Sequence, residues 1–335
     1  MSSERPIPNS SRLAEALSRL PFSWWWPILP GVVAGVALRL AFWGGPGHPY
    51  APMTMAFIYL SPIVVGAVTV YAAERKKRRT WAYYAQASFL ATMLYVVGTL
   101  LIMIEGLICA ALIAPLFGLL GIVGGLIMGL VCRITKWPKQ TLLGIAILPF
   151  VLGPLEGGMP LPTHASAVER TVLASAPPSE VWRQIMHADG IRPEEIERAW
   201  IFRIGVPLPL AGTTHGGARR VTMGKRVYFD EIITASDENQ YVRWTYHFYP
   251  DSFPPGALDD HVVIGGHYFD VLDTAYTLIP DGERTRVSVR VQYRVSTRFN
   301  WYAEPVAALL LGNMAEANLN FYRQRSEAAT SARAP

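Results

Sequence analysis

The stretch 285–325 joins two different hydrophobic periods and constrains the fold more than any other part of the chain. In its first part apolar residues alternate strictly with polar ones, at Val287, Val289, Val291, Tyr293 and Val295. Alternation with a period of two indicates a β-strand with one buried face. Residues 301–325 contain no Gly-Pro or Asn-Gly break, and we expect one long helix whose first half is apolar on most sides. A last strand that leads into such a helix predicts a helix lying across a curved sheet.

Apolar residues are distributed unevenly along the rest of the chain. Hydrophobic residues make up 51% of the 335 residues and charged residues only 16%, which is unusual for a water-soluble protein. The first 160 residues contain 12 Lys or Arg and 5 Asp or Glu, whereas the remainder contains 18 and 20. The basic excess therefore belongs to the apolar part, and we expect no nucleic-acid binding. Cys109 and Cys132 both lie in apolar runs, so we expect no disulfide framework in the C-terminal half.

Residues 22–157 are predicted to form an all-α transmembrane bundle of four or five helices. A membrane span needs about 20 apolar residues, and the runs 22–43, 55–71, 81–104 and 107–131 are long enough or nearly so. The shorter run 141–155 contains two prolines and is either a tilted fifth span or a re-entrant segment. Residues 1–21 are interpreted as a cytoplasmic segment with a short amphipathic helix on the membrane. A signal peptide is the alternative for this start.

Basic residues between the runs predict the orientation. They gather at 75–79 and 133–139, whereas 44–54 and 157–164 contain no Lys or Arg. By the positive-inside rule, the N-terminus and both basic segments are cytoplasmic. Five spans place the C-terminal half outside the cytoplasm, in the periplasm, and four spans place it inside. We favour five, in the inner or plasma membrane, because the run after residue 139 is too apolar for a surface loop.

Three ionisable residues, Arg39, Glu105 and Glu156, lie in or near these runs. All three fall close to predicted helix ends, so we interpret them as hydrated terminal groups, and Arg39 can extend its side chain to the interface. The fourth run also carries small residues at a spacing that suits close helix packing. These are Gly121, Gly124, Gly125 and Gly129.

The C-terminal half is predicted to be an α+β domain at 168–328. A linker rich in Pro and Gly precedes it at 158–167, and a disordered tail follows at 329–335. A helix is expected to begin at Pro178 and end near His187, with proline and glutamate in its first turn. The other elements are a short helix at 193–198 and strands at 168–174, 200–204, 218–223, 226–234, 241–249, 268–278 and 285–295.

Several local sequences in this half match a known pattern. They are Ser-Ala-Pro-Pro-Ser-Glu-Val-Trp at 175–182, Met-Gly-Lys at 223–225 before Phe-Asp-Glu-Ile at 229–232, and the passage from 293–297 to Trp301 and Tyr302. Gly-Val-Pro-Leu-Pro at 205–209 is similar to a loop of membrane-attached proteins. With the order of elements, these sequences resemble the SRPBCC superfamily, the START-like or helix-grip fold that includes polyketide cyclase/dehydrase proteins. The resemblance implies a curved antiparallel sheet around a long C-terminal helix, but no particular activity.

The same resemblance implies an apolar cavity between the sheet and the terminal helix. Trp244, Tyr246 and Phe248 share one face of their strand and are suited to line it. Pockets of this kind are mostly apolar with a few polar groups. Filling of a closed core is the alternative role for each side chain. The predicted ligand-contacting residues are Trp182, Phe229, Trp244, Tyr246, Phe248, Phe269, Tyr276, Tyr293, Val306, Leu309 and Leu310.

The loop 251–266 is predicted to be a gate over the cavity or a tip that touches the bilayer, with an ordinary exposed loop as the alternative. Ser252 in this loop is expected to be exposed. His261, His267 and Asp270, in and beside the loop, are weak catalytic candidates because they could act as acid and base. No metal site is expected, because no HExxH or similar spacing occurs. No phosphate loop, dinucleotide fingerprint or nucleophile elbow occurs either, and no cofactor is predicted.

The sequence therefore predicts a membrane-anchored binding or transfer protein that holds a lipid, sterol, isoprenoid or quinone. Burial of each CH₂ group of such a ligand is favourable by about 0.8 kcal/mol, so an apolar cavity can bind it without a catalytic group. The predicted partners are this hydrophobic molecule and the bilayer. One alternative is an enzyme of the cyclase/dehydrase or hydrolase kind that acts on an apolar substrate. Another is a sensor in which ligand binding is transmitted to the spans.

Overall fold

The computed structural model describes residues 25–135, 139–156, 159–196, 199–258 and 262–333. The chain divides into two compact units, one helical and one built around a sheet. The helical unit is made mainly of α2 (Ile28–Ala41), α3 (Met55–Glu74), α4 (Trp81–Leu101), α5 (Leu107–Ile134) and α6 (Lys139–Glu156).

Three helices of the described chain, α3, α4 and α5, are long and apolar enough to cross a membrane. The predicted count of four or five spans is not matched. Helix α2 has 14 residues, which is about 21 Å at a rise of about 1.5 Å per residue and shorter than the roughly 30 Å hydrocarbon layer. It begins only after Pro27, and residues 22–24 of the predicted first span lie outside the described residues. Helix α6 contains Pro149 and Pro154 and is also among the shorter apolar helices.

Glycines allow α5 to approach α3 and α4 closely, as predicted from the small-residue spacing. A Cβ atom on Gly124 would lie 2.2 Å from the carbonyl oxygen of Ile63, and one on Gly125 would lie 2.0 Å from the Ser88 hydroxyl. A Cβ atom on Gly66 of α3 would lie 2.0 Å from the carbonyl oxygen of Gly121. Side chains at these positions would force the helix backbones apart.

Two of the three ionisable residues make more contacts within the protein than predicted. Arg39 is only 1% exposed, donates a hydrogen bond to the Phe42 carbonyl oxygen over 2.9 Å and lies over the Trp43 ring, so it is not a hydrated, extended side chain. Glu156 accepts hydrogen bonds from the backbone N–H groups of Met55 and Ala56 over 2.7 and 2.6 Å. These groups open α3, and a carboxylate there is favourable because the first N–H groups of a helix lack partners. Glu105 lies between α4 and α5, as predicted.

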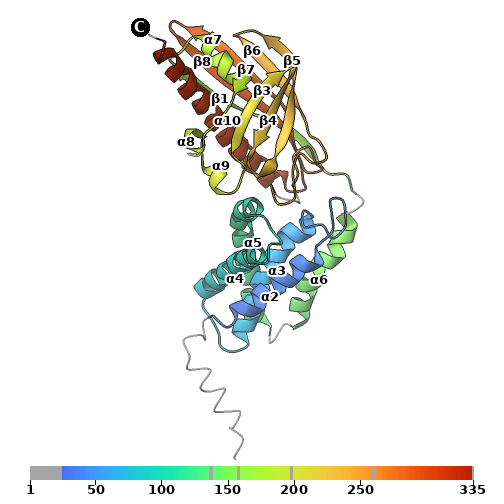
Figure 1. Cartoon of the computed structure of the whole chain (residues 1–335). Coiled ribbons are helices and arrows are strands. Elements are labelled where there is room, and N and C mark those ends of the chain that lie inside the picture. Colours follow the sequence, from blue (N-terminus) through green and yellow to red (C-terminus); the bar gives the residue numbers. More distant parts are fainter. Residues whose placement is uncertain (1–24, 136–138, 157–158, 197–198, 259–261, 334–335) are drawn as a thin grey trace, which may run out of the picture. The chain divides into compact units, whose positions relative to one another are not determined.

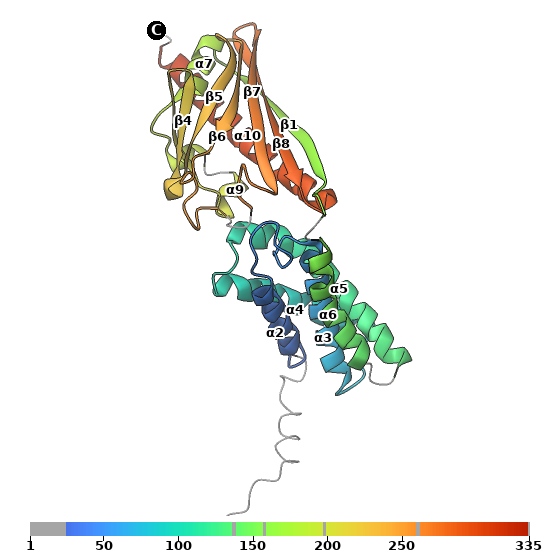
Figure 2. The ribbon, with the colours of Figure 1, turned by 90° about the vertical axis from the view of Figure 1, so that its right-hand side faces the viewer.

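The second unit is a curved antiparallel sheet with a long helix along its concave side (Figure 1 and Figure 2). Its eight strands follow the order β1-β8-β7-β6-β5-β4-β3-β2. Register shifts in β3, β5 and β7 add to the curvature, because a bulge bends its strand. The strands are β1 (Thr163–Ala174), β2 (His187–Ala188), β3 (Pro209–His215), β4 (Ala218–Met223), β5 (Tyr228–Asp237), β6 (Tyr241–His247), β7 (Phe269–Asp281) and β8 (Arg284–Ser296).

The helices of this unit are α7 (Pro178–Met186), α8 (Pro193–Ile196), α9 (Trp200–Arg203) and α10 (Asn300–Ser331), with the short 3₁₀ turn η2 (Gly224–Arg226) after β4. Helix α10 packs against β1, β8, α7, α8 and α9. The predicted architecture, a curved sheet around a long C-terminal helix, is confirmed for this unit.

Four predicted element assignments are corrected by the structure. Residues 200–204 are not a strand but form the short helix α9, whose Ile201 is buried and donates its N–H to the Asn313 side chain of α10. Strand β3 is not predicted, because its Pro, Ala and Gly residues are poor strand signals that pairing with β4 overrides. Strand β1 begins at Thr163 and not at 168, and α10 continues to Ser331, into the predicted tail.

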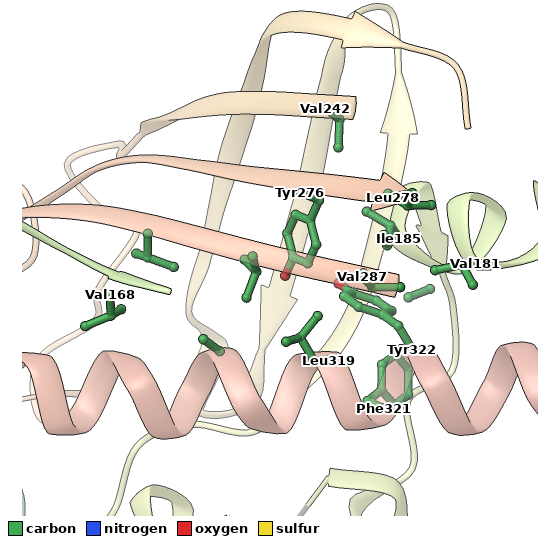
Figure 3. Packing of buried hydrophobic residues seen from close by; sticks show 14 of the residues in the cluster. Val168, Val181, Ile185, Val242, Tyr276, Leu278, Val287, Leu319, Phe321 and Tyr322 are labelled. Carbon is green, nitrogen blue, oxygen red and sulfur yellow. The ribbon is translucent and has the colours of Figure 1, made fainter. Parts of the chain in front are cut away.

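The core of this unit lies between β8, its neighbours and α10 (Figure 3). All five apolar residues that alternate along β8 are buried, as predicted, the most exposed being Val291 at 8%. Helix α10 contributes buried residues spaced three to five apart, among them Ala315 of the core cluster. Its Leu319 and Tyr322 lie on the side of the strands (Figure 3). In the same helix Trp301 and Leu309 are 62% and 56% exposed, so part of its predicted apolar surface faces away from the core.

Candidate functional site

A cavity of about 200 Å³ lies between the sheet and the middle part of α10. Its wall is formed mainly by strands β3 to β8 and α10, together with Val206, Pro207, Phe253, Leu258 and Ile264. Most of the wall is apolar. The lining side chains include Arg219, Val221, Phe229, Glu231, Trp244, Tyr246, Phe248, Phe253, Leu258, Ile264, Thr274, Tyr276, Leu311, Met314, Ala315, Asn318 and Tyr322.

Aromatic rings form the sheet side of the cavity. Tyr246 and Phe248 stack with their centroids 5.9 Å apart, and the Phe229 ring lies within 6 Å of both. Phe253 extends this group from the loop, 5.3 Å from Phe248. Such offset and tilted arrangements are favourable for rings and present flat apolar surface to a ligand.

A buried ion pair lies in the wall of this apolar space. Arg219 of β4 and Glu231 of β5 are directly paired in the sheet register and are only 5% and 6% exposed. The Arg219 guanidinium donates to a Glu231 carboxylate oxygen over 2.5 Å and to the Tyr322 hydroxyl of α10 over 3.2 Å. A buried charge is costly unless it is paired, so the two residues depend on each other. The pair therefore places one polar site in the otherwise mostly apolar wall of the cavity.

Three aromatic side chains surround the guanidinium. It lies over the Trp244 ring, 5.6 Å from the centroid, and Trp244 packs against Tyr276. Tyr276 in turn meets Tyr322 edge to face, with centroids 5.9 Å apart. Burial raises the pKa of Tyr276 well above its ordinary value and also raises the pKa of Tyr322, so both phenols are neutral at physiological pH.

Burial also acts on the two ionised partners. It raises the pKa of the Glu231 carboxyl, and Arg219 opposes this shift. The pKa of Arg219 is raised although burial opposes its charge, because Tyr322 and Glu231 lie beside it. The guanidinium is therefore the fixed charge of the site, and it favours the ionised form of Glu231 against the effect of burial.

A second polar contact is already complete. The hydroxyl groups of Tyr246 and Thr274 lie 2.6 Å apart across neighbouring strands. Burial raises the pKa of Tyr246, so its hydroxyl keeps its proton and this hydrogen bond. Neither group needs a ligand to satisfy it.

A second hollow of about 330 Å³ adjoins this cavity at the loop 250–266. The two share Phe248, Phe253, Leu258 and Ile264 in their walls. The predicted exposed residue Ser252 is fully buried, and its hydroxyl accepts a hydrogen bond from the Tyr249 N–H over 2.8 Å. The start of the loop is therefore a structured turn.

The predicted ligand-contacting residues fall into two groups. Phe229, Trp244, Tyr246, Phe248 and Tyr276 line the cavity. The others do not: Trp182, Phe269 and Tyr293 pack in or against the core cluster, Val306 and Leu310 are half-buried, and Leu309 is exposed. Helix α10 reaches the cavity with Leu311, Met314, Ala315 and Asn318. The first three lie five residues further along the helix than the three predicted positions.

Two of the weak catalytic candidates, His267 and Asp270, do not line the cavity. His267 is exposed and its ring meets Tyr268, whereas Asp270 is half-buried near Gly265. Burial raises the pKa of Asp270, and nearby Arg294 opposes that shift. His261 lies outside the described residues. Within the described residues no group of three or more His, Cys, Asp or Glu side chains is placed to hold a metal ion.

The buried pair is absent from the sequence prediction because Arg and Glu are rarely fully buried unless they are paired. Strand parity carries the signal: Arg219 is two residues before Val221, and Glu231 is two residues after Phe229, so each shares the inward face of an apolar neighbour. A charged residue at such a position in both of two adjacent strands predicts a buried cross-strand pair.

No protein-family model matches the chain, and no curated protein matches it. Similar solved structures include a START superfamily protein from Mycobacterium smegmatis, with 13% identity, a TM-score of 0.33 and coverage of 49% of this chain and 98% of that one. TTHA0849 from Thermus thermophilus has 18% identity, a TM-score of 0.31 and coverage of 49% and 99%. SA2116 from Staphylococcus aureus, a protein of unknown function, has 12% identity, a TM-score of 0.33 and coverage of 50% and 98%. These values are low, and the helix-grip assignment depends on the strand order and terminal helix described above.

Proposed function

We propose that this chain is a membrane-anchored binding or transfer protein that holds a hydrophobic small molecule between its curved sheet and α10. The observation that supports it is a cavity whose wall is mostly apolar and whose few polar groups are fixed by neighbours. Ligand sites in proteins have this composition, with polar groups that set orientation. Binding needs no catalytic group, because removal of apolar surface from water is favourable by itself.

The apolar helices support the membrane-anchoring part of the proposal. Helices α3, α4 and α5 have the length and composition of membrane spans, and a tether to the bilayer would raise the effective concentration of a membrane-dissolved ligand at the cavity. Lipids, isoprenoids and quinones are the ligand classes that such an arrangement favours. Placement of the sheet unit outside the cytoplasm is part of this proposal and depends on whether α6 also crosses the membrane.

Cavity-filling variants test the binding function. Ala315→Phe from α10 and Val221→Phe from β4 would each occupy the cavity, since both residues line it and are less than 10% exposed. Leu309→Phe is the matched control on the exposed side of α10. The full chain would be purified in mild detergent and its bound small molecules measured by native mass spectrometry and extraction.

We expect the wild-type protein and Leu309→Phe to carry the same apolar molecule. Each filling variant should lose most of it, with a stability cost of about 1–3 kcal/mol for overpacking. A wild-type protein without any bound apolar molecule would contradict the proposal, as would equal loading of the filling variants.

A further inference from the structure

Two buried hydrogen-bond donors of the cavity wall have no partner among the described residues. They are the Nε–H of Arg219 and the indole Nε1–H of Trp244. Both side chains line the cavity, and their residues are 5% and 2% exposed. The guanidinium lies over the indole ring, so the two donors belong to one part of the wall.

Such donors are unusual, because most buried polar groups are hydrogen-bonded and an unsatisfied one is destabilising. The neighbouring polar groups do not serve them. The Tyr322 hydroxyl and the Glu231 carboxylate accept from the terminal nitrogens of Arg219. The Tyr246 hydroxyl is engaged with Thr274 and lies near the indole N–H of Trp244, but makes no hydrogen bond of normal geometry with it. What this part of the cavity lacks is an acceptor.

We propose that the ligand carries an uncharged oxygen acceptor of the carbonyl type, and that Arg219 and Trp244 bind it. This inference rests on the proposed binding function and names the chemistry of the ligand's polar end. A carboxylate fits less well, because the charge of Arg219 is already balanced by Glu231, and a second anion would lie beside the first. An amine or ammonium group fits less well because its N–H groups would meet N–H groups.

The cavity volume limits the part of the ligand that enters. An engineered cavity of about 150 Å³ in another protein holds benzene. The space of about 200 Å³ therefore suits one substituted ring, or an equivalent short branched chain, with its carbonyl at the donors. A longer apolar tail would have to continue past Phe248 and Phe253 into the second hollow, which shares these residues.

The test compares acetophenone with ethylbenzene, which have nearly the same shape but differ by a carbonyl group in place of a methylene. Binding is measured by calorimetry on the full chain in lipid nanodiscs, with empty nanodiscs as the blank for partitioning. We expect acetophenone to bind roughly tenfold more tightly, as satisfying buried donors implies. Benzoate should bind at least tenfold more weakly than acetophenone.

Two variants locate the effect. Trp244→Phe removes one unpaired donor and should reduce the preference for acetophenone at least threefold. Tyr241→Phe is the control on the same strand: it removes a hydroxyl from a residue that does not line the cavity, and the preference should be unchanged. The double variant Arg219→Met/Glu231→Met removes the other donor without leaving a lone charge, and it decides the question if Trp244→Phe does not fold.

Equal affinity for acetophenone and ethylbenzene would overturn the carbonyl proposal and leave the proposed apolar binding intact; it would mean that water satisfies the donors. A loss of preference in Tyr241→Phe as large as in Trp244→Phe would also overturn it. Binding of neither probe would overturn this inference together with the proposed function.

Discussion

Gly212 makes room for the buried guanidinium of the cavity wall. A Cβ atom at this position would lie 2.2 Å from a terminal nitrogen of Arg219, closer than any real contact. A glycine inside a strand often marks such a close approach. The ion pair of Arg219 and Glu231 therefore requires a residue without a side chain at position 212 of β3. Because glycine is rare in strands, this requirement also weakens the sequence signal of β3.

Gly212→Ala should displace Arg219 and destabilise the fold by about 1–3 kcal/mol, the usual cost of overpacking. Gly224→Ala is the control, because its new Cβ atom would meet nothing closer than 3.6 Å. The measurement is thermal unfolding of the full chain followed by intrinsic fluorescence. Equal stability of the two variants would show that the guanidinium moves without cost.

Removal of one partner of the buried pair should cost more than removal of both. Arg219→Met leaves the Glu231 carboxylate buried and uncompensated, and we expect a loss of about 3–5 kcal/mol. The double variant Arg219→Met/Glu231→Met should recover most of it, because packed apolar groups can replace a buried pair. Chemical denaturation of the wild type, Arg219→Met and the double variant checks this order of stability. A double variant less stable than Arg219→Met would contradict it.

At the scale of elements, α8 is held to α10 by a clamp of one arginine and one glutamate. Arg325 donates to both Glu195 oxygens, over 2.9 and 2.8 Å, and to the carbonyl oxygens of Asp189 and Gly190. The hydrogen bonds from Arg325 are the main cause that lowers the pKa of Glu195 to about 2. The clamp is thus ionised over the whole physiological range.

The sign of the pH effect follows from this lowered pKa. The ordinary value is 4.5, so the stabilisation is fully present above about pH 4.5 and is lost as the pH falls towards 2. Arg325→Gln should lower the unfolding temperature at pH 7, and the difference from wild type should shrink between pH 4.5 and 2. Melting curves across this interval check it; a difference that is independent of pH would contradict the ionic character of the clamp.

The elements differed in how far the sequence could predict them. Strand β8 was predictable because one face is buried along its whole length, which leaves strict alternation in the sequence. Helix α10 was predictable as an element but not in its rotation: its first half is apolar on several sides, so periodicity did not separate exposed Leu309 from Leu311 at the cavity. Helix α9 and β3 depend on contacts with α10 and β4 that no local pattern contains.

At the scale of the whole molecule, the side of the membrane on which the sheet unit lies remains a prediction from charge. Glu283, in the exposed turn between β7 and β8, is a suitable probe position. In a chain whose Cys109 and Cys132 are replaced by alanine, Glu283→Cys should react with an impermeant maleimide on intact cells. Lys77→Cys in the basic segment should react only after lysis. Reaction of Glu283→Cys only after lysis would place the sheet unit in the cytoplasm and show that α6 does not cross.

The pairing of β1 with β8 sets an order of events during synthesis. Thr163 pairs with Ser296 and Ala174 with Thr285, so β1 leaves the ribosome long before its partner strand is made. Helix α10, which packs on both strands, is completed last. Contacts so distant in sequence form slowly, and the strands in between expose apolar faces while they wait. A nascent chain of this protein therefore cannot pair β1 until β8 has emerged, and β1 and β8 stay uncovered until α10 follows.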